Sequence, residues 1–230
     1  KQANKFIVAV TGVKSNTDWF NNAYESKGQG SGIIIADSGQ ELLILTEHEK
    51  VKDGDLKVRF YDHTEAAGTL KKYDSNTGLA VISVNLSDVD SSTREVISYA
   101  ELGSSKSLRS GQPVIVVGNP TGSNGSLLFG NLTSVMQTAE LYDSSYNILT
   151  TDILKSSNGS GVVADWSGKI IGLLQEKTEV EGQDNTIQAY GISDVKDLIE
   201  HLSNNQDIVY MGIVGADVTT AISETENIPI

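Results

Sequence analysis

Short β-prone runs, each ended by Gly, Asn, Asp or Ser, follow one another along almost the whole chain. Strands that are this short and evenly spaced, and that are joined by turn residues, are typical of all-β barrels or sandwiches. The 22 glycines agree with this, because glycine supplies the positive φ angles of tight turns and bulges. The sequence therefore predicts an all-β fold. Examples of the runs are FIVAVTGV at 6–13, LLILT at 42–46, LAVISVN at 79–85, PVIVVGN at 113–119 and KIIGLLQE at 169–176.

The composition is that of a folded domain with an acidic surface. With 230 residues, 38% of them hydrophobic, the chain can bury one substantial core or two small ones. Its 17 basic and 30 acidic residues give a formal charge of -13, which repels phosphate backbones, so nucleic acid is not expected as a partner. The sequence contains no cysteine, which excludes disulfides, thiolate metal sites and a cysteine nucleophile.

Residues 193–205 depart from the strand pattern and predict an amphipathic helix that closes the domain. The segment begins with Ser193, a residue type favoured at helix N-caps. Its apolar residues recur at helical spacing: Val195, Leu198, Ile199 and Leu202. Residues 85–111 are polar and Ser-rich, and they are the expected connection between two barrels.

The sequence shows neither a metal motif nor a nucleotide motif. Its histidines, His48, His63 and His201, have no partner at i, i+4 spacing and no Cys/His cluster. The glycine-rich GQGSG at 28–32 runs into the strand-like IIIAD, whereas a phosphate cradle needs a helix N-terminus behind its glycines. No metal and no cofactor is therefore expected.

A serine between two glycines, Ser160, leaves serine hydrolysis as the chemistry to consider. That chemistry needs a serine on a turn with converging N–H groups, a histidine that takes its proton and a carboxylate that orients the histidine. His63 directly follows Asp62, so the two residues imitate the histidine and the carboxylate of a triad. We expect His63 to face water rather than to take part in catalysis.

Several segments resemble, in the same order, motifs of HtrA/Deg-type trypsin-like serine proteases. GQGSGIIIADSGQELLILTEH at 28–48 is similar to G-S-G-x-I-I... G-x-I-L-T-N-x-H, and DSNTGLAVISV at 74–84 is similar to D-x-x-T-D-L-A-V-L. PVIVVGNPTG at 113–122 is similar to A-I-G-N-P-x-G. TTDILKSSNGSGVVADWSGKIIGL at 150–173 is similar to T-D-A-A-I-N-x-G-N-S-G-G-x-L-x-N-x-x-G-x-V-I-G-I. AYGISDVKDLIEHL at 189–202 resembles the segment that enters the family's C-terminal helix.

The resemblance implies an all-β chymotrypsin/trypsin-like fold, a double six-stranded β-barrel with a C-terminal helix. The protease domain would cover 1–205, with the N-terminal barrel over about 1–90, the C-terminal barrel over about 110–192 and the helix over 193–205. Residues 206–230 would begin a PDZ domain. The resemblance also implies a polypeptide as substrate or ligand and a homo-oligomer, a trimer in the family. It further implies an extracytoplasmic location with an anchor in a preceding N-terminal segment.

The same resemblance places the nucleophile on Ser160 and the base on His48, with the N–H groups of Gly159 and Ser160 in the oxyanion hole. Counted from Asp152, the family's serine falls on Ser160, but counted back from GKIIGL at 168–173 it falls on Gly159. His48 follows LILT as the family's histidine does, although the count from Thr46 leads to Glu49.

Departures from the motif leave two functions open. The acid position directly before LAV holds Gly78, and Asp74 lies too far along an extended strand to replace it without a rebuilt turn. Asn158 and Val162 stand where the family has glycines. One function is an HtrA-like endopeptidase for unfolded or extended polypeptide, with catalysis impaired or lost. The other is a protease-derived, non-catalytic peptide-binding or scaffold protein.

Overall fold

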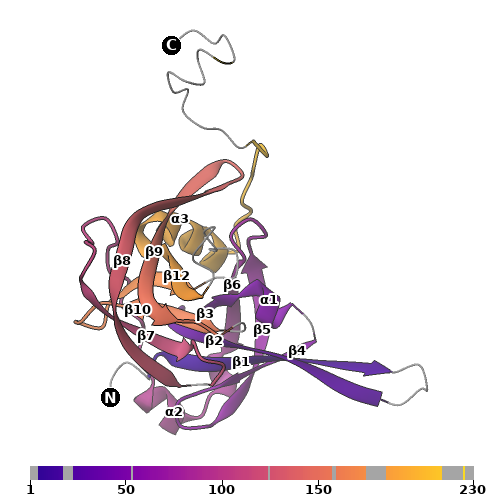
Figure 1. The fold of residues 1–230 in the computed structure, drawn as a ribbon. Helices are drawn as coiled ribbons and strands as arrows, with labels where there is room; N and C mark the ends of the chain where they lie inside the picture. The colour runs from indigo at the N-terminus through magenta and orange to yellow at the C-terminus, as the bar shows by residue number, and fades with distance from the viewer. Residues whose placement is uncertain are drawn as a thin grey trace.

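The chain folds into two closed antiparallel barrels of six strands each and one C-terminal helix, which confirms the expected double β-barrel (Figure 1). The structure is a computed structural model that describes residues 5–17, 23–52, 54–123, 125–156, 159–174, 185–213 and 225. Within these ranges, no helix is long and apolar enough to cross a membrane.

The N-terminal barrel closes in the order β1-β2-β3-β6-β5-β4. Its strands are β1 (Ile7–Thr17), β2 (Ala23–Asp37), β3 (Glu41–Glu47), β4 (Asp55–Arg59), β5 (Glu65–Tyr73) and β6 (Leu79–Asn85), and helix α1 (His48–Val51) follows β3. Strand β3 is buried on both faces because its residues serve two cores. Leu42 and Ile44 fill the barrel, whereas Leu43 and Leu45 face the cluster between the barrels.

The connection between the barrels lies where the sequence predicted it, but it is not featureless. It carries the 3-10 helix η1 (Leu86–Asp88) and helix α2 (Ser91–Val96), neither of which the sequence predicted. Thr93 of α2 is fully buried and donates a hydrogen bond of 2.7 Å to the carboxylate of Asp62. The connection is thereby fixed to the N-terminal barrel.

The C-terminal barrel closes in the order β10-β11-β12-β9-β8-β7. Its strands are β7 (Pro113–Asn119), β8 (Ser126–Leu141), β9 (Ser144–Leu154), β10 (Ser160–Ala164), β11 (Ile170–Leu174) and β12 (Thr186–Gly191). Its core contains mainly β-branched and leucine side chains, among them the fully buried Val116, Val163 and Ile187. The β8–β9 hairpin is long and projects beyond the barrel (Figure 1).

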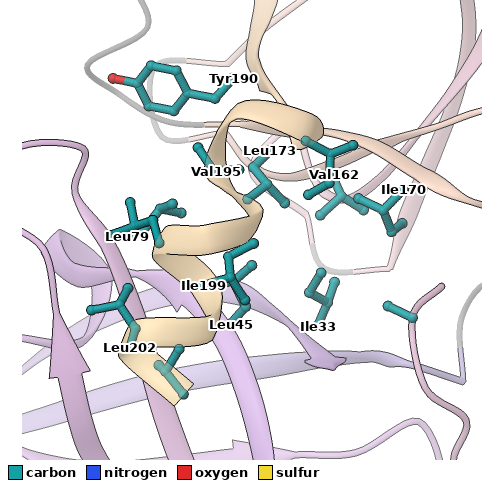
Figure 2. Close-up of a cluster of buried hydrophobic side chains, with 14 of the residues drawn as sticks. Ile33, Leu45, Leu79, Val162, Ile170, Leu173, Tyr190, Val195, Ile199 and Leu202 are labelled. Atoms are coloured by element: carbon teal, nitrogen blue, oxygen red, sulfur yellow. The ribbon is translucent and has the colours of Figure 1, made fainter. Parts of the chain in front are cut away.

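Helix α3 (Ile192–Ser203) packs against both barrels, and its predicted apolar face is buried as expected. Figure 2 shows the cluster in which Val195, Ile199 and Leu202 of the helix meet side chains of the N-terminal barrel and of the C-terminal barrel. The predicted N-cap was wrong, because the N-cap is Gly191, two residues earlier, and the helix begins at Ile192. Ser193 instead exchanges hydrogen bonds with Ser105, at 2.8 Å and 3.1 Å.

The chain that leaves α3 is tied to both barrels through residues 206–213. Asp143, at the tip of the β8–β9 hairpin, donates its N–H to the carbonyl of Ile213 at 2.7 Å. Its carboxylate accepts the N–H groups of Gly212 and Ile213 at 2.9 Å and 3.0 Å. Lys72 of β5 pairs with Asp207 at 2.5 Å. Most of the predicted PDZ segment, residues 214–224 and 226–230, lies outside the described residues.

Candidate functional site

Ser160, the predicted nucleophile, is the first residue of β10 and lies at the junction of the two barrels. Its side chain is fully buried, and its Oγ accepts a hydrogen bond of 2.9 Å from the backbone N–H of Ser31 in β2. Strand β10 pairs with β7 in continuous register from Ser160 opposite Asn119 onward, which fixes the orientation of the serine. The hydroxyl therefore joins a strand of one barrel to a strand of the other.

Glycines allow the strands to approach closely around this hydrogen bond. Gly118 and Gly161 have φ angles of 132° and 144°. A Cβ on Gly118 would lie 2.9 Å from the Ser31 Oγ, and one on Gly161 would lie 2.3 Å from the carbonyl oxygen of Val117. We call this set, Ser31, Gly118, Ser160 and Gly161, the barrel seam. The cavity beside it between the barrels measures about 20 Å³, enough for about one water molecule.

In the loop before Ser160, one of the two predicted oxyanion-hole donors already makes a hydrogen bond within the chain. The N–H of Gly159 donates to the carbonyl oxygen of Ser156 at 2.9 Å, within a turn. A Cβ on Gly159 would lie 2.6 Å from the carbonyl oxygen of Pro120, so the loop is packed against β7's end. Val162 is buried in β10, and Asn158 lies outside the described residues.

His48, the predicted base, is the first residue of α1 and is half-buried. Its ring stacks on that of Tyr73, with the centroids 3.7 Å apart and the planes 2° from parallel. Its backbone N–H donates to the carbonyl of Gly78 at 2.9 Å. The preceding residue, Glu47, is buried and lines the 20 Å³ cavity between the barrels. The imidazole is thus held on the N-terminal barrel by an aromatic face.

The acid position is next to the base but carries no side chain. Gly78 closes the β5–β6 turn with a φ of 81°, in the left-handed region. The nearby Asp74 is buried, and its carboxylate accepts hydrogen bonds from the Thr77 N–H at 2.8 Å, the Thr77 hydroxyl at 2.6 Å and the Asn76 N–H at 3.1 Å. Asp74 therefore stabilises its own turn, and its carboxylate is engaged there.

The structure thus brings two of the three family positions together and gives the serine another partner. His48 and Gly78 are joined through their backbones, whereas the Ser160 hydroxyl is joined to Ser31. His63 is exposed, and the Asp62 carboxylate turns to Thr64 and Thr93. Within the described ranges, no group of His, Asp or Glu side chains gathers where it could hold a metal ion.

Sequence reasoning missed the residues that organise this region. Ser31 lies in the G-S-G segment that carries the family resemblance, but that motif gives no sign of a bond to a residue 129 positions away. Tyr73 ends β5 without any local signal for a histidine partner. Asn119, opposite Ser160, buries a side-chain oxygen that has no hydrogen-bonding partner in the described part of the chain.

Two closed six-stranded barrels with a serine at their junction, at the start of β10, define a protein of the chymotrypsin-like class. Residues 30–173 match the family described as "Trypsin-like peptidase domain", and the chain belongs to that family. Its relatives within the family are HtrA-type proteases.

One relative is "Serine protease Do-like HtrA" of Bacillus subtilis (strain 168), 28% identical over 92% of this chain and 50% of the relative. Another is "Serine protease HtrA-like" of Staphylococcus aureus (strain MRSA252), 26% identical over 91% of this chain and 28% of the relative. The chain therefore spans half or less of the length of these relatives. Among solved structures, "HtrA-type protease AlgW with decapeptide" superposes with a TM-score of 0.74 at 18% identity, over 97% of this chain and 73% of that one.

Proposed function

We propose that this chain is an HtrA-like, trypsin-family domain that binds extended polypeptide and has lost serine protease catalysis. The observation that carries the proposal is the buried hydrogen bond from the Ser31 N–H to the Ser160 Oγ. A nucleophilic serine needs a base within hydrogen-bond reach and must meet the substrate carbonyl. The Ser160 hydroxyl is buried in the barrel seam and has a backbone donor as its partner.

The motif supports the same reading when it is counted back from GKIIGL at 168–173. In that register the family's serine corresponds to Gly159, and Ser160 corresponds to the glycine that follows the serine. Ser160 would then occupy a packing position at the junction of the barrels. The neighbouring Gly161 occupies such a position, because it lies against the backbone of Val117. A nucleophile would be absent, because glycine has no side chain.

The missing acid of the triad supports the proposal independently. An aspartate that orients the histidine is worth about 10⁴-fold in kcat in a working triad. Gly78 has no carboxylate to offer, and Asp74 uses its own within the turn. The imidazole of His48 stacks on the ring of Tyr73, which holds it against β5.

Polypeptide binding is proposed from the family and from its solved structures. The structural neighbour named above carries a decapeptide by its title. The proposal includes the expectations of a homo-oligomer and of a location outside the cytoplasm, which rest on the resemblance to HtrA/Deg-type proteases.

Labelling by a fluorophosphonate tests the loss of catalysis. We expect no stoichiometric label on Ser160 and no cleavage of a fluorescent unfolded polypeptide, while fluorescence anisotropy detects binding of peptides from the same polypeptide. Ser160→Ala serves as the matched blank, and an active trypsin-like protease serves as the positive control. Stoichiometric labelling that disappears in Ser160→Ala would establish an active endopeptidase and overturn the proposal.

A further inference from the structure

An open cavity of about 400 Å³ lies beside the barrel seam, on the outer face of the N-terminal barrel. The register places Ala9 of β1 between Ser31 of β2 and Arg59 of β4, so the three residues form one row across adjacent strands. Ser31 lines this cavity and also donates the hydrogen bond to Ser160. Gly125, from the β7–β8 connection, closes the cavity from the C-terminal barrel.

The cavity combines an apolar floor with an available cation. Ile7 and the exposed Tyr61 contribute apolar surface, and the buried Val8 and Phe60 lie beneath it. The exposed Arg59 has no hydrogen-bond or ion-pair partner in the described part of the chain, and it forms no ion pair with Glu65, its cross-strand neighbour on β5. A guanidinium binds carboxylates through two parallel hydrogen bonds, and a pocket of this size is typical of a ligand site.

The rim of the cavity is braced in place. His63 lines the cavity with a φ of 70°, a left-handed conformation that is uncommon for residues other than glycine. Its N–H donates to the carbonyl of Phe60 at 3.0 Å, and the Phe60 N–H donates to Thr64 at 2.9 Å. Asp62 fixes the turn from behind, because its carboxylate accepts hydrogen bonds from Thr64 and Thr93. The backbone that carries the His63 side chain is therefore fixed at the rim of the cavity.

Burial and hydrogen bonding act in opposite directions on Asp62. Desolvation by itself raises the pKa of this carboxyl, but the hydrogen bonds from Thr64 and Thr93 outweigh it and lower the pKa below its usual range. The carboxylate thus stays charged and keeps the turn that carries His63 closed at neutral pH.

We propose that this cavity binds the carboxylate of an Asp or Glu side chain of a polypeptide that lies across the barrel junction. Arg59 would donate two parallel hydrogen bonds to the carboxylate, and His63 would contribute a further N–H donor. The apolar residues of the cavity would contact the methylene groups of the acidic side chain. The peptide class rests on the proposed function, whereas the selectivity for an acidic residue rests on the cavity alone.

Two matched peptides test this selectivity on the intact chain. One is a short fluorescein-labelled peptide of Ala, Val and Ser with one central Glu, and the other carries Gln in its place. We expect the Glu peptide to bind up to about fivefold more tightly by anisotropy, since an ion pair with an exposed guanidinium contributes at most about 1 kcal/mol. Arg59→Gln should bring the two affinities within about twofold of each other. Its thermal stability should equal that of the parent, because Arg59 is exposed.

Lys57→Gln is the matched control, because Lys57 lies on the same strand, is exposed and does not line the cavity. It should keep the preference for Glu. Equal affinities of the parent chain for both peptides overturn the inference, and so does an equal loss of preference in both variants, which would indicate unspecific attraction. Failure of the proposed function is seen separately, as cleavage of the peptides or labelling of Ser160; if neither peptide binds, both proposals fall.

Discussion

Replacing Ser160 by alanine should destabilise the domain, which a purely catalytic serine would not do. The substitution removes the acceptor of the Ser31 N–H, in a place where Ser160 is 0% and Ser31 8% exposed. A buried donor that loses its acceptor costs about 1–3 kcal/mol. For a domain of this size each kcal/mol lowers Tm by about 2–4 °C. We therefore expect a loss of about 2 kcal/mol and a Tm lower by about 4–8 °C.

Urea unfolding followed by circular dichroism measures this loss, and linear extrapolation gives the free energy of unfolding. Ser31→Ala is the matched control, because it removes the neighbouring hydroxyl but leaves the Ser31 N–H and its bond to Ser160 in place. It should cost less than about 1 kcal/mol. Functional side chains are often kept at the expense of stability. A Ser160→Ala variant as stable as the parent, or more stable, would therefore refute a structural role for this hydroxyl.

Three further changes test other parts of the reasoning. Gly78→Asp should add about 1–2 kcal/mol of backbone strain, because the residue has a φ of 81°, and should create no peptidase activity; cleavage of a fluorescent polypeptide by this variant would contradict the account of the site. Leu202→Ala should cost about 2–5 kcal/mol while calorimetry still shows one transition, because the fully buried Leu202 belongs to the cluster between α3 and both barrels; two separate transitions would show that the helix does not couple the barrels. The backbone N–H and the side-chain amide of Asn131 donate hydrogen bonds to Asp152 and lower its pKa in the folded state. The Asp152 carboxylate therefore stabilises the fold above the unfolded pKa of about 3.9, and this stabilisation is lost as the pH falls through the lower folded pKa. Asp152→Asn should flatten the acid limb of a plot of Tm against pH, and an unchanged acid limb would speak against this assignment.

Much of the fold follows from local patterns in the sequence. Strand β4 alternates exposed and buried residues with period two, as DLKVR suggests. The apolar stripe of α3 was predicted residue by residue, because helical spacing alone determines which side chains share a face. Helix α2 was missed because a run of Ser and Thr carries little helical signal, and its buried contact is to the distant Asp62.

The candidate site could be predicted only as far as its neighbourhood. The order of the motifs assigned the nucleophile position to Ser160, but two counts of the same motif disagreed by one residue. In a strand, a shift of one residue reverses the direction of a side chain. Only the three-dimensional pairing with β7 and the contact with Ser31 decide where the hydroxyl lies. The stacking of His48 on Tyr73 is likewise a contact between distant segments that no spacing rule predicts.

The bonds that hold residues 206–213 have a mechanical consequence. Tension applied to the chain beyond residue 213 reaches Asp143 first, then the Lys72–Asp207 pair and only afterwards helix α3. These contacts are exposed and screened by solvent, so they are weak beside the packing of the buried face of α3. Residues 206–213 would therefore detach under load before either barrel deforms, and the domain itself would stay folded.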